Sequence, residues 1–74
     1  MEIKNLIRMA NDIGSFFKSY PDQDQAKEDT ASHIHKFWDR GMRVTIKKYV
    51  TETSLKESQL DQFVFEAINK YLKD

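Results

Sequence analysis

The densest group of chemically capable side chains in the sequence lies in residues 33–43, HIHKFWDRGMR. This stretch contains two histidines, the aromatic pair Phe37 and Trp38, one aspartate and two arginines. Histidine and aspartate can bind a metal or transfer a proton, whereas Trp and Arg are enriched in the hot spots of protein–protein interfaces. Three kinds of site are therefore considered: a metal or catalytic centre, a nucleic-acid contact, and an anchor for another protein.

The spacing of the histidines does not favour a metal site. His33 and His35 are two residues apart, and side chains with that spacing point to nearly opposite sides of a helix. Asp29 lies one helical turn before His33, but no third His or Cys follows at ligand spacing, and zinc sites use at least three protein ligands. We predict no metal ligands in this chain, with His33 half-buried and hydrogen-bonded and His35 in solvent.

Catalytic motifs are missing from the sequence as well. It contains no Cys, no G-x-S-x-G turn and no Gly-rich phosphate loop, and its serines stand near helix ends, where hydroxyl groups cap backbone amides. A chain of 74 residues also offers little room for a pocket that excludes water. We predict no catalytic and no cofactor-binding residues, and no enzyme activity for the chain by itself.

The charge pattern makes nucleic acid an unfavourable partner. Twelve basic and twelve acidic side chains cancel, although residues 22–29 are mainly acidic and residues 36–48 mainly basic. A DNA reader would insert residues 40–50 in the major groove, with Arg40 and Arg43 at the bases, but the acidic segment would repel the duplex. No apolar run approaches the ~20 residues of a membrane span, and no signal peptide is recognisable. We expect a cytoplasmic chain that binds neither nucleic acid nor membrane.

The elements that must position these residues are helices. Apolar residues recur at intervals of three and four, and only two Gly and one Pro interrupt the chain, which predicts an all-α bundle of about four helices in one domain, residues 1–74. The helices are expected over 2–19, 23–38, 40–50 and from a capping box at Ser58 and Asp61 to about residue 71, with Asp22 and Asp39 as further caps. The residues expected to face the core are Ile3, Leu6, Ile7, Ala10, Gly14, Phe17, Ala26, Thr30, His33, Ile34, Phe37, Met42, Ile46, Tyr49, Val50, Leu60, Phe63, Val64, Ala67, Ile68 and Tyr71.

Several apolar side chains lie outside the stripes that are expected to form the core. A second stripe on the first helix, Met9, Ile13, Phe16 and Tyr20, predicts a partner surface, because a free monomer seldom exposes so many adjacent large apolar groups. Phe65 is expected to be an isolated surface residue. Since consecutive helical residues differ by about 100°, we place Phe37 inward and Trp38 at the rim of the turn that follows. Lys47 and Lys48 are expected on a solvated face.

Two stretches resemble a known family. LIRMANDIGSFFKSYP at 6–21 and ASHIHKFWDRGMR at 31–43 are similar to the delta subunits of NAD-dependent formate dehydrogenases, in which a MAN-x-I-x-x-FF segment precedes an A-x-HI-x-x-FW-D-P-R-M-R segment. LDQFVFEAINKYL at 60–72 is similar to the last helix of that family. The chain departs from the family where Arg40 and Gly41 replace its usual Pro-Arg.

The resemblance implies an accessory subunit without cofactors that binds the large catalytic subunit and supports assembly, stability or cofactor loading. The partner subunits would carry a molybdenum or tungsten pterin, iron–sulfur clusters and flavin, and would oxidise formate to carbon dioxide with NAD. One alternative is a free-standing helical interaction module that self-associates. A small DNA-binding protein is a weaker alternative. The residues expected to contact the partner are Met9, Asn11, Phe16, Tyr20, Trp38, Arg40 and Arg43.

Overall fold

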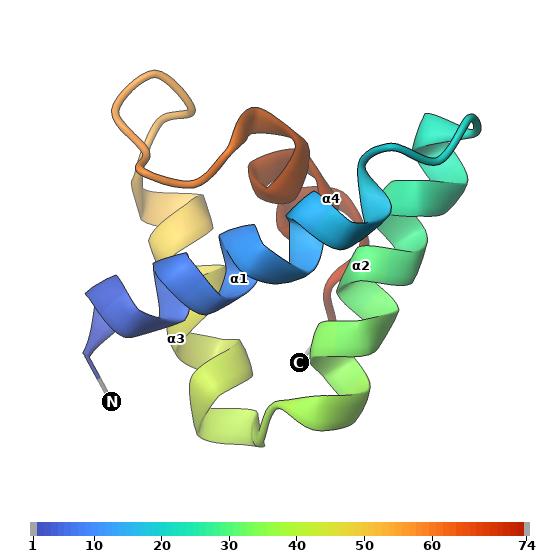
Figure 1. Cartoon of the computed structure of the whole chain (residues 1–74). Helices are drawn as coiled ribbons and strands as arrows, with labels where there is room; N and C mark the ends of the chain where they lie inside the picture. The colour runs from blue at the N-terminus through green and yellow to red at the C-terminus, as the bar shows by residue number, and fades with distance from the viewer. Residues whose placement is uncertain (1, 74) are drawn as a thin grey trace.

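The computed structural model describes residues 2–73 and contains four helices. They are α1 (Ile3–Phe17), α2 (Gln23–Phe37), α3 (Arg40–Glu52) and α4 (Gln62–Tyr71). Figure 1 shows α2 and α3 on opposite sides of the molecule, α1 running across between them, and α4 behind α1. The predicted all-α class is confirmed. Within residues 2–73, no helix combines the length and the apolar character needed to cross a membrane.

Two of the three predicted helix starts have the expected caps. The Asp22 carboxylate accepts a hydrogen bond from the backbone amide of Gln25 at 3.1 Å, and Asp39 accepts one from Met42 at 2.9 Å. The capping box at Ser58 is wrong, because α4 begins only at Gln62. The Ser58 hydroxyl instead accepts from the amide of Leu60 at 3.0 Å, a local turn that competes with helix formation.

The core is built from the predicted apolar stripes and centres on α4, which packs against each of the other three helices. The largest fully buried side chains are Leu6, Thr30, Ile34, Ile46, Val64, Ile68 and Leu72. Phe65 is also buried, so its prediction as a surface residue is wrong. A helix enclosed by three neighbours buries more than one stripe of its circumference, and α4 is such a helix.

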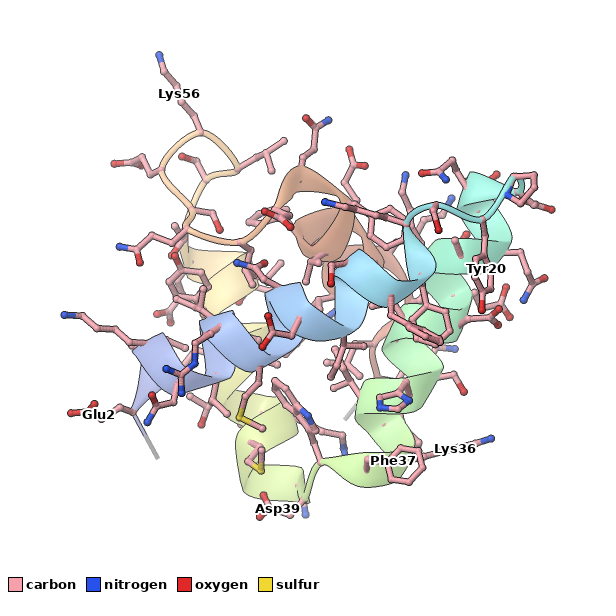
Figure 2. The ribbon with its side chains drawn as sticks, in the orientation of Figure 1. Glu2, Tyr20, Lys36, Phe37, Asp39 and Lys56 are labelled. Atoms are coloured by element: carbon pink, nitrogen blue, oxygen red, sulfur yellow. The ribbon has the colours of Figure 1, made fainter. Side chains whose placement is uncertain are left out.

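The predicted directions of Phe37 and Trp38 are reversed. Trp38 is 5 % exposed and Phe37 is 72 % exposed. The helical wheel fails here because α2 ends at Phe37, and Trp38 has extended backbone angles, φ −94° and ψ 142°. The chain therefore turns at Trp38 and directs the indole into the core. Figures 1 and 2 show that α1 meets α2 far from the end at Phe37, which projects from the molecule.

Close packing of α1 on α4 depends on Gly14. A Cβ atom at this position would overlap the Cγ2 methyl of Val64, so only the missing side chain of glycine permits the approach. The other glycine, Gly41, has no such neighbour: the nearest atom to its Cβ position is a carboxylate oxygen of Asp39 at 3.4 Å. The two helical glycines thus have different roles.

We expect Trp38→Ala to lower the free energy of unfolding by about 3–5 kcal/mol, as for other buried aromatic side chains. Phe37→Ala should change it by no more than about 0.5 kcal/mol, because the phenyl ring is mostly in solvent. Urea denaturation of both variants, followed by circular dichroism, measures the difference. Equal losses in the two variants would contradict the observed reversal.

Opposite effects are expected from the same substitution at the two glycines. Gly41→Ala should stabilise the protein by up to about 1 kcal/mol, because alanine is the better helix former. Gly14→Ala should destabilise it by about 1–3 kcal/mol through overpacking against Val64. Thermal melts measure both, and Val64→Ala in the Gly14→Ala background should recover part of the loss. If Gly14→Ala stabilised the protein, α1 and α4 would be able to move apart without a loss of stability, which would contradict the close packing at Gly14.

Candidate functional site

Five ring-bearing side chains form a connected row that begins where α1 meets α2 and continues along α2 to its last residue. Phe16 and Phe17 belong to α1, Tyr20 follows α1, and His33 and Phe37 belong to α2. The ring centroids are 5.2 Å apart for Phe16 and Phe17, 5.6 Å for Phe17 and Tyr20, 6.1 Å for Phe17 and His33, and 4.6 Å for His33 and Phe37. We call these five residues the aromatic ridge.

The aromatic ridge is largely open to solvent. Phe16 is 68 % exposed, Tyr20 is 39 % exposed, and Phe37 is among the most exposed apolar side chains described. Figure 2 shows Tyr20 near one end of α2 and Phe37 at the other. Phe17 and His33 are half-buried and form the base of the row. Exposed apolar surface of this kind is typical of protein interaction sites, in which aromatic residues supply much of the contact area.

A shallow hollow of about 350 Å³ lies within the aromatic ridge, lined by Asp12, Ile13, Phe16, Phe17 and His33. Its walls are mainly apolar. Because the hollow is open, it can accept an apolar side chain from another molecule but cannot shield a reacting substrate from water. Its geometry suits recognition better than catalysis.

The histidines lie apart from each other, as their spacing predicts. His33 is half-buried as expected, but its imidazole makes ring contacts with Phe17 and Phe37, and the predicted hydrogen bond is not found among residues 2–73. His35 is exposed, with Nδ1 at 3.3 Å from the carbonyl oxygen of Lys73. The described part of the chain contains no group of three or more His, Cys, Asp or Glu side chains able to hold a metal.

The predicted apolar stripe of α1 is only partly at the surface. Phe16 and Tyr20 are exposed, whereas Met9 and Ile13 are half-buried and pack against the core. The stripe therefore contributes its C-terminal half to the aromatic ridge. The contribution of Phe37 was missed because the helical wheel placed this residue inward.

Two predicted contact residues near the start of α3 have internal roles. Trp38 is buried, and one Nη of Arg43 donates hydrogen bonds to the backbone carbonyls of Trp38 at 2.7 Å and His35 at 3.4 Å. Arg43 therefore satisfies carbonyls at the C-terminal end of α2, a usual position for a cation. Arg40, at the start of α3, is exposed. Of these three residues, Trp38 is buried, Arg43 is half-buried and Arg40 is exposed.

Lys47 serves the end of α4 in the same way. Its ammonium group donates to the carbonyl oxygens of Ile68 at 2.8 Å and Asn69 at 2.9 Å. Our prediction of a solvated lysine at this position is wrong, because the last turn of α4 leaves carbonyl groups without intrahelical partners. Because Arg43 and Lys47 bind backbone carbonyls of this chain, these two cations of α3 are less available to phosphate groups.

Asn11 joins α1 to the segment that precedes α4. Its amide nitrogen donates to the carbonyl of Gln59 at 3.2 Å, and its amide oxygen accepts from the backbone amide of Asp61 at 2.9 Å. These bonds link residues 48 and 50 positions apart. Both sides of the amide are thus used within the chain. In the sequence, Asn11 directly follows Ala10 of the buried stripe of α1, and this position at the edge of the stripe is the signal that its side chain could bond within the fold.

Ion pairs support the helix arrangement away from the aromatic ridge. Lys27 of α2 and Glu66 of α4 approach to 3.0 Å. This hydrogen-bonded ammonium, together with Gln62, holds the pKa of the Glu66 carboxyl below its ordinary value of 4.5. The pair therefore stabilises the fold above the ordinary pKa and loses this effect as the pH falls through the lowered one. Because both groups are partly exposed, the contribution is small.

Asn11→Asp should destabilise the protein by about 1–3 kcal/mol, because the new carboxylate faces the Gln59 carbonyl and cannot donate to it. Asn5→Asp is the matched control. Asn5 is an exposed amide in the first turn of the same helix, where an acid is neutral or slightly favourable. Denaturant titration at neutral pH compares the two. Equal free energies of unfolding in the two variants would contradict the structural role of Asn11.

Comparison with known proteins identifies one family. The family model described as "NADH-dependant formate dehydrogenase delta subunit FdsD" matches residues 5–68, which include most of α1, all of α2 and α3, and most of α4. No curated protein and no solved structure gives a significant match. Because the matched segment is most of the chain and contains both motif segments and the aromatic ridge, this protein belongs to the FdsD family of NADH-dependent formate dehydrogenase delta subunits.

Proposed function

We propose that the chain is a non-catalytic accessory subunit that binds the large catalytic subunit of a formate dehydrogenase and supports its assembly, stability or cofactor loading. The family match over residues 5–68 carries the proposal. The exposed aromatic ridge supports it, because its open, apolar form suits binding to another protein.

The use of the polar side chains supports the non-catalytic part of this proposal. Asn11, Arg43 and Lys47 each reach from one helix to another segment of the chain, and each is bonded to backbone atoms at the end of a helix or next to one. Their chemistry is thus directed to holding four short helices together. In the proposed complex, formate oxidation and electron transfer to NAD occur on the pterin metal, iron–sulfur clusters and flavin of the partner subunits.

A subunit without cofactors can act on such a complex through binding linkage. A ligand that binds only the folded partner stabilises it by about 2.7 kcal/mol at a concentration one hundred times its dissociation constant. This gain would raise the amount of assembled, cofactor-loaded enzyme, while the chemistry at each centre would be unchanged. The alternative of a self-associating module would use the same aromatic ridge and is separated from the proposal by the experiments below.

Cells that lack this chain should contain less assembled formate dehydrogenase and show less formate-dependent NAD reduction. Activity per mole of bound pterin metal should stay at the parent level, because the chain is proposed to act on assembly and not on the reaction. The measurements are the assembled complex by native electrophoresis, the metal content of the purified enzyme and the rate of NADH formation.

Restoring the chain from a plasmid is the control and should return all three quantities to the parent level. Parent levels of activity, metal and complex in the deletion strain would refute the accessory role. A collapse of activity per metal alone would show that the chain takes part in the chemistry.

A further inference from the structure

We infer that the aromatic ridge, with Asp12 and Asp29 beside it, docks an apolar segment of the catalytic partner that also carries basic side chains. The inference rests on the proposed function for the identity of the partner. It adds the face of this chain that makes the contact and the chemistry of the segment that covers it.

The apolar part of the docking surface consists of exposed aromatic rings that stand above half-buried ones. Phe16 and Phe37 stand out on either side of the half-buried pair Phe17 and His33. The ring contacts among these residues hold the row in one arrangement before binding, so little side-chain freedom is lost on docking. The hollow between Phe16 and His33 can receive one apolar side chain of the partner.

Two carboxylates, Asp12 and Asp29, lie beside the ridge. Asp12 is exposed and lines the hollow together with His33. Asp29 lies one turn before His33 and therefore on the same side of α2, where it is half-buried and accepts a hydrogen bond from Gln25 at 2.9 Å. A carboxylate from each helix thus borders the centre of the ridge, and exposed Lys36 lies only at the Phe37 end.

Neither carboxylate is within 4.0 Å of a cation in residues 2–73, although exposed Arg8 lies one turn before Asp12 on α1. Lys18 of the α1–α2 connection is 3.8 Å from Asp61, and Lys27 is paired with Glu66 of α4. The complementary surface must therefore combine apolar side chains with Lys or Arg, of which Arg can bind a carboxylate through two parallel hydrogen bonds. A second copy of this chain is less suitable, since ridge-to-ridge pairing would bring the carboxylates of both copies into one interface.

A competition experiment in the native cell tests the inference with the complete complex. A tagged variant and the untagged parent chain are produced together, the enzyme is purified through its catalytic subunit, and mass spectrometry measures the ratio of the two chains in it. Because the parent chain is present, the complex can assemble whatever the variant does. A tagged parent chain sets the reference ratio.

Phe16→Ala and Phe37→Ala should each lower the incorporated share about tenfold or more, as for interface hot spots. Asp12→Asn and Asp29→Asn should lower it several-fold. Asp24→Asn is the matched control. Asp24 is an exposed acid on α2 that lies with Lys27 and Glu66 on the side facing α4, and its replacement should leave the share unchanged. Thermal melts confirm that each variant remains folded.

The outcomes separate this inference from the proposed function. If the tagged parent chain is absent from the purified enzyme, both are overturned. If it is present and every ridge variant is incorporated equally well, the docking surface is refuted and the accessory role stands. Increased incorporation of Asp12→Asn and Asp29→Asn would refute a basic partner segment. Gel filtration that shows a dimer of the isolated chain, broken by Phe16→Ala, would assign the ridge to a second copy and overturn the inference.

Discussion

The burial of α4 among the other three helices is the constraint on which the rest of the structure depends. This short helix packs against each of the other three, and Val64, Phe65, Ala67 and Ile68 are all buried. A chain of this size removes only a little over half of its surface from water, so a central helix that is apolar on most sides is an efficient use of few residues. The close approach of α1 at Gly14 brings a second helix onto it.

Polar side chains from other helices bind the backbone near both ends of α4. Asn11 binds the backbone immediately before its first turn, and Lys47 binds the carbonyls of its last turn. Short helices leave a large fraction of their backbone groups without intrahelical partners, and this fold satisfies several of them with side chains from other helices. Arg43 does the same for α2. The polar groups that looked most available for function are in this way used for architecture.

The same arrangement leaves one side of the α1–α2 junction uncovered. α4 lies behind α1 (Figure 1), and the rings at the α1–α2 junction contact each other while Phe16, Tyr20 and Phe37 stay exposed to solvent. In the proposed complex this surface would be covered by the catalytic subunit, which also accounts for the large exposed area of Phe16 and Phe37. The histidines of the opening stretch thus belong to different surroundings: His33 to the aromatic ridge and His35 to the end of α4.

The sequence by itself determined the helices, most of the core and the family. Periodicity at three and four residues marks the buried stripes reliably because it reflects the geometry of a single helix, and Asp22 and Asp39 act as caps through contacts within one turn. The motif segments at 6–21 and 31–43 pointed to the family that the match over residues 5–68 identifies.

Only the tertiary structure decided the directions of Phe37 and Trp38, the burial of Phe65 and the bonds of Asn11 and Lys47. Each of these depends on where one helix ends or on what lies across it, over separations of 21 to 50 residues for the two polar side chains. A wheel projection assumes that the helix continues and that one side of it faces solvent. Trp38 violates the first assumption and Phe65 the second, because an extended residue after α2 and a helix surrounded by three others are properties of the assembled fold.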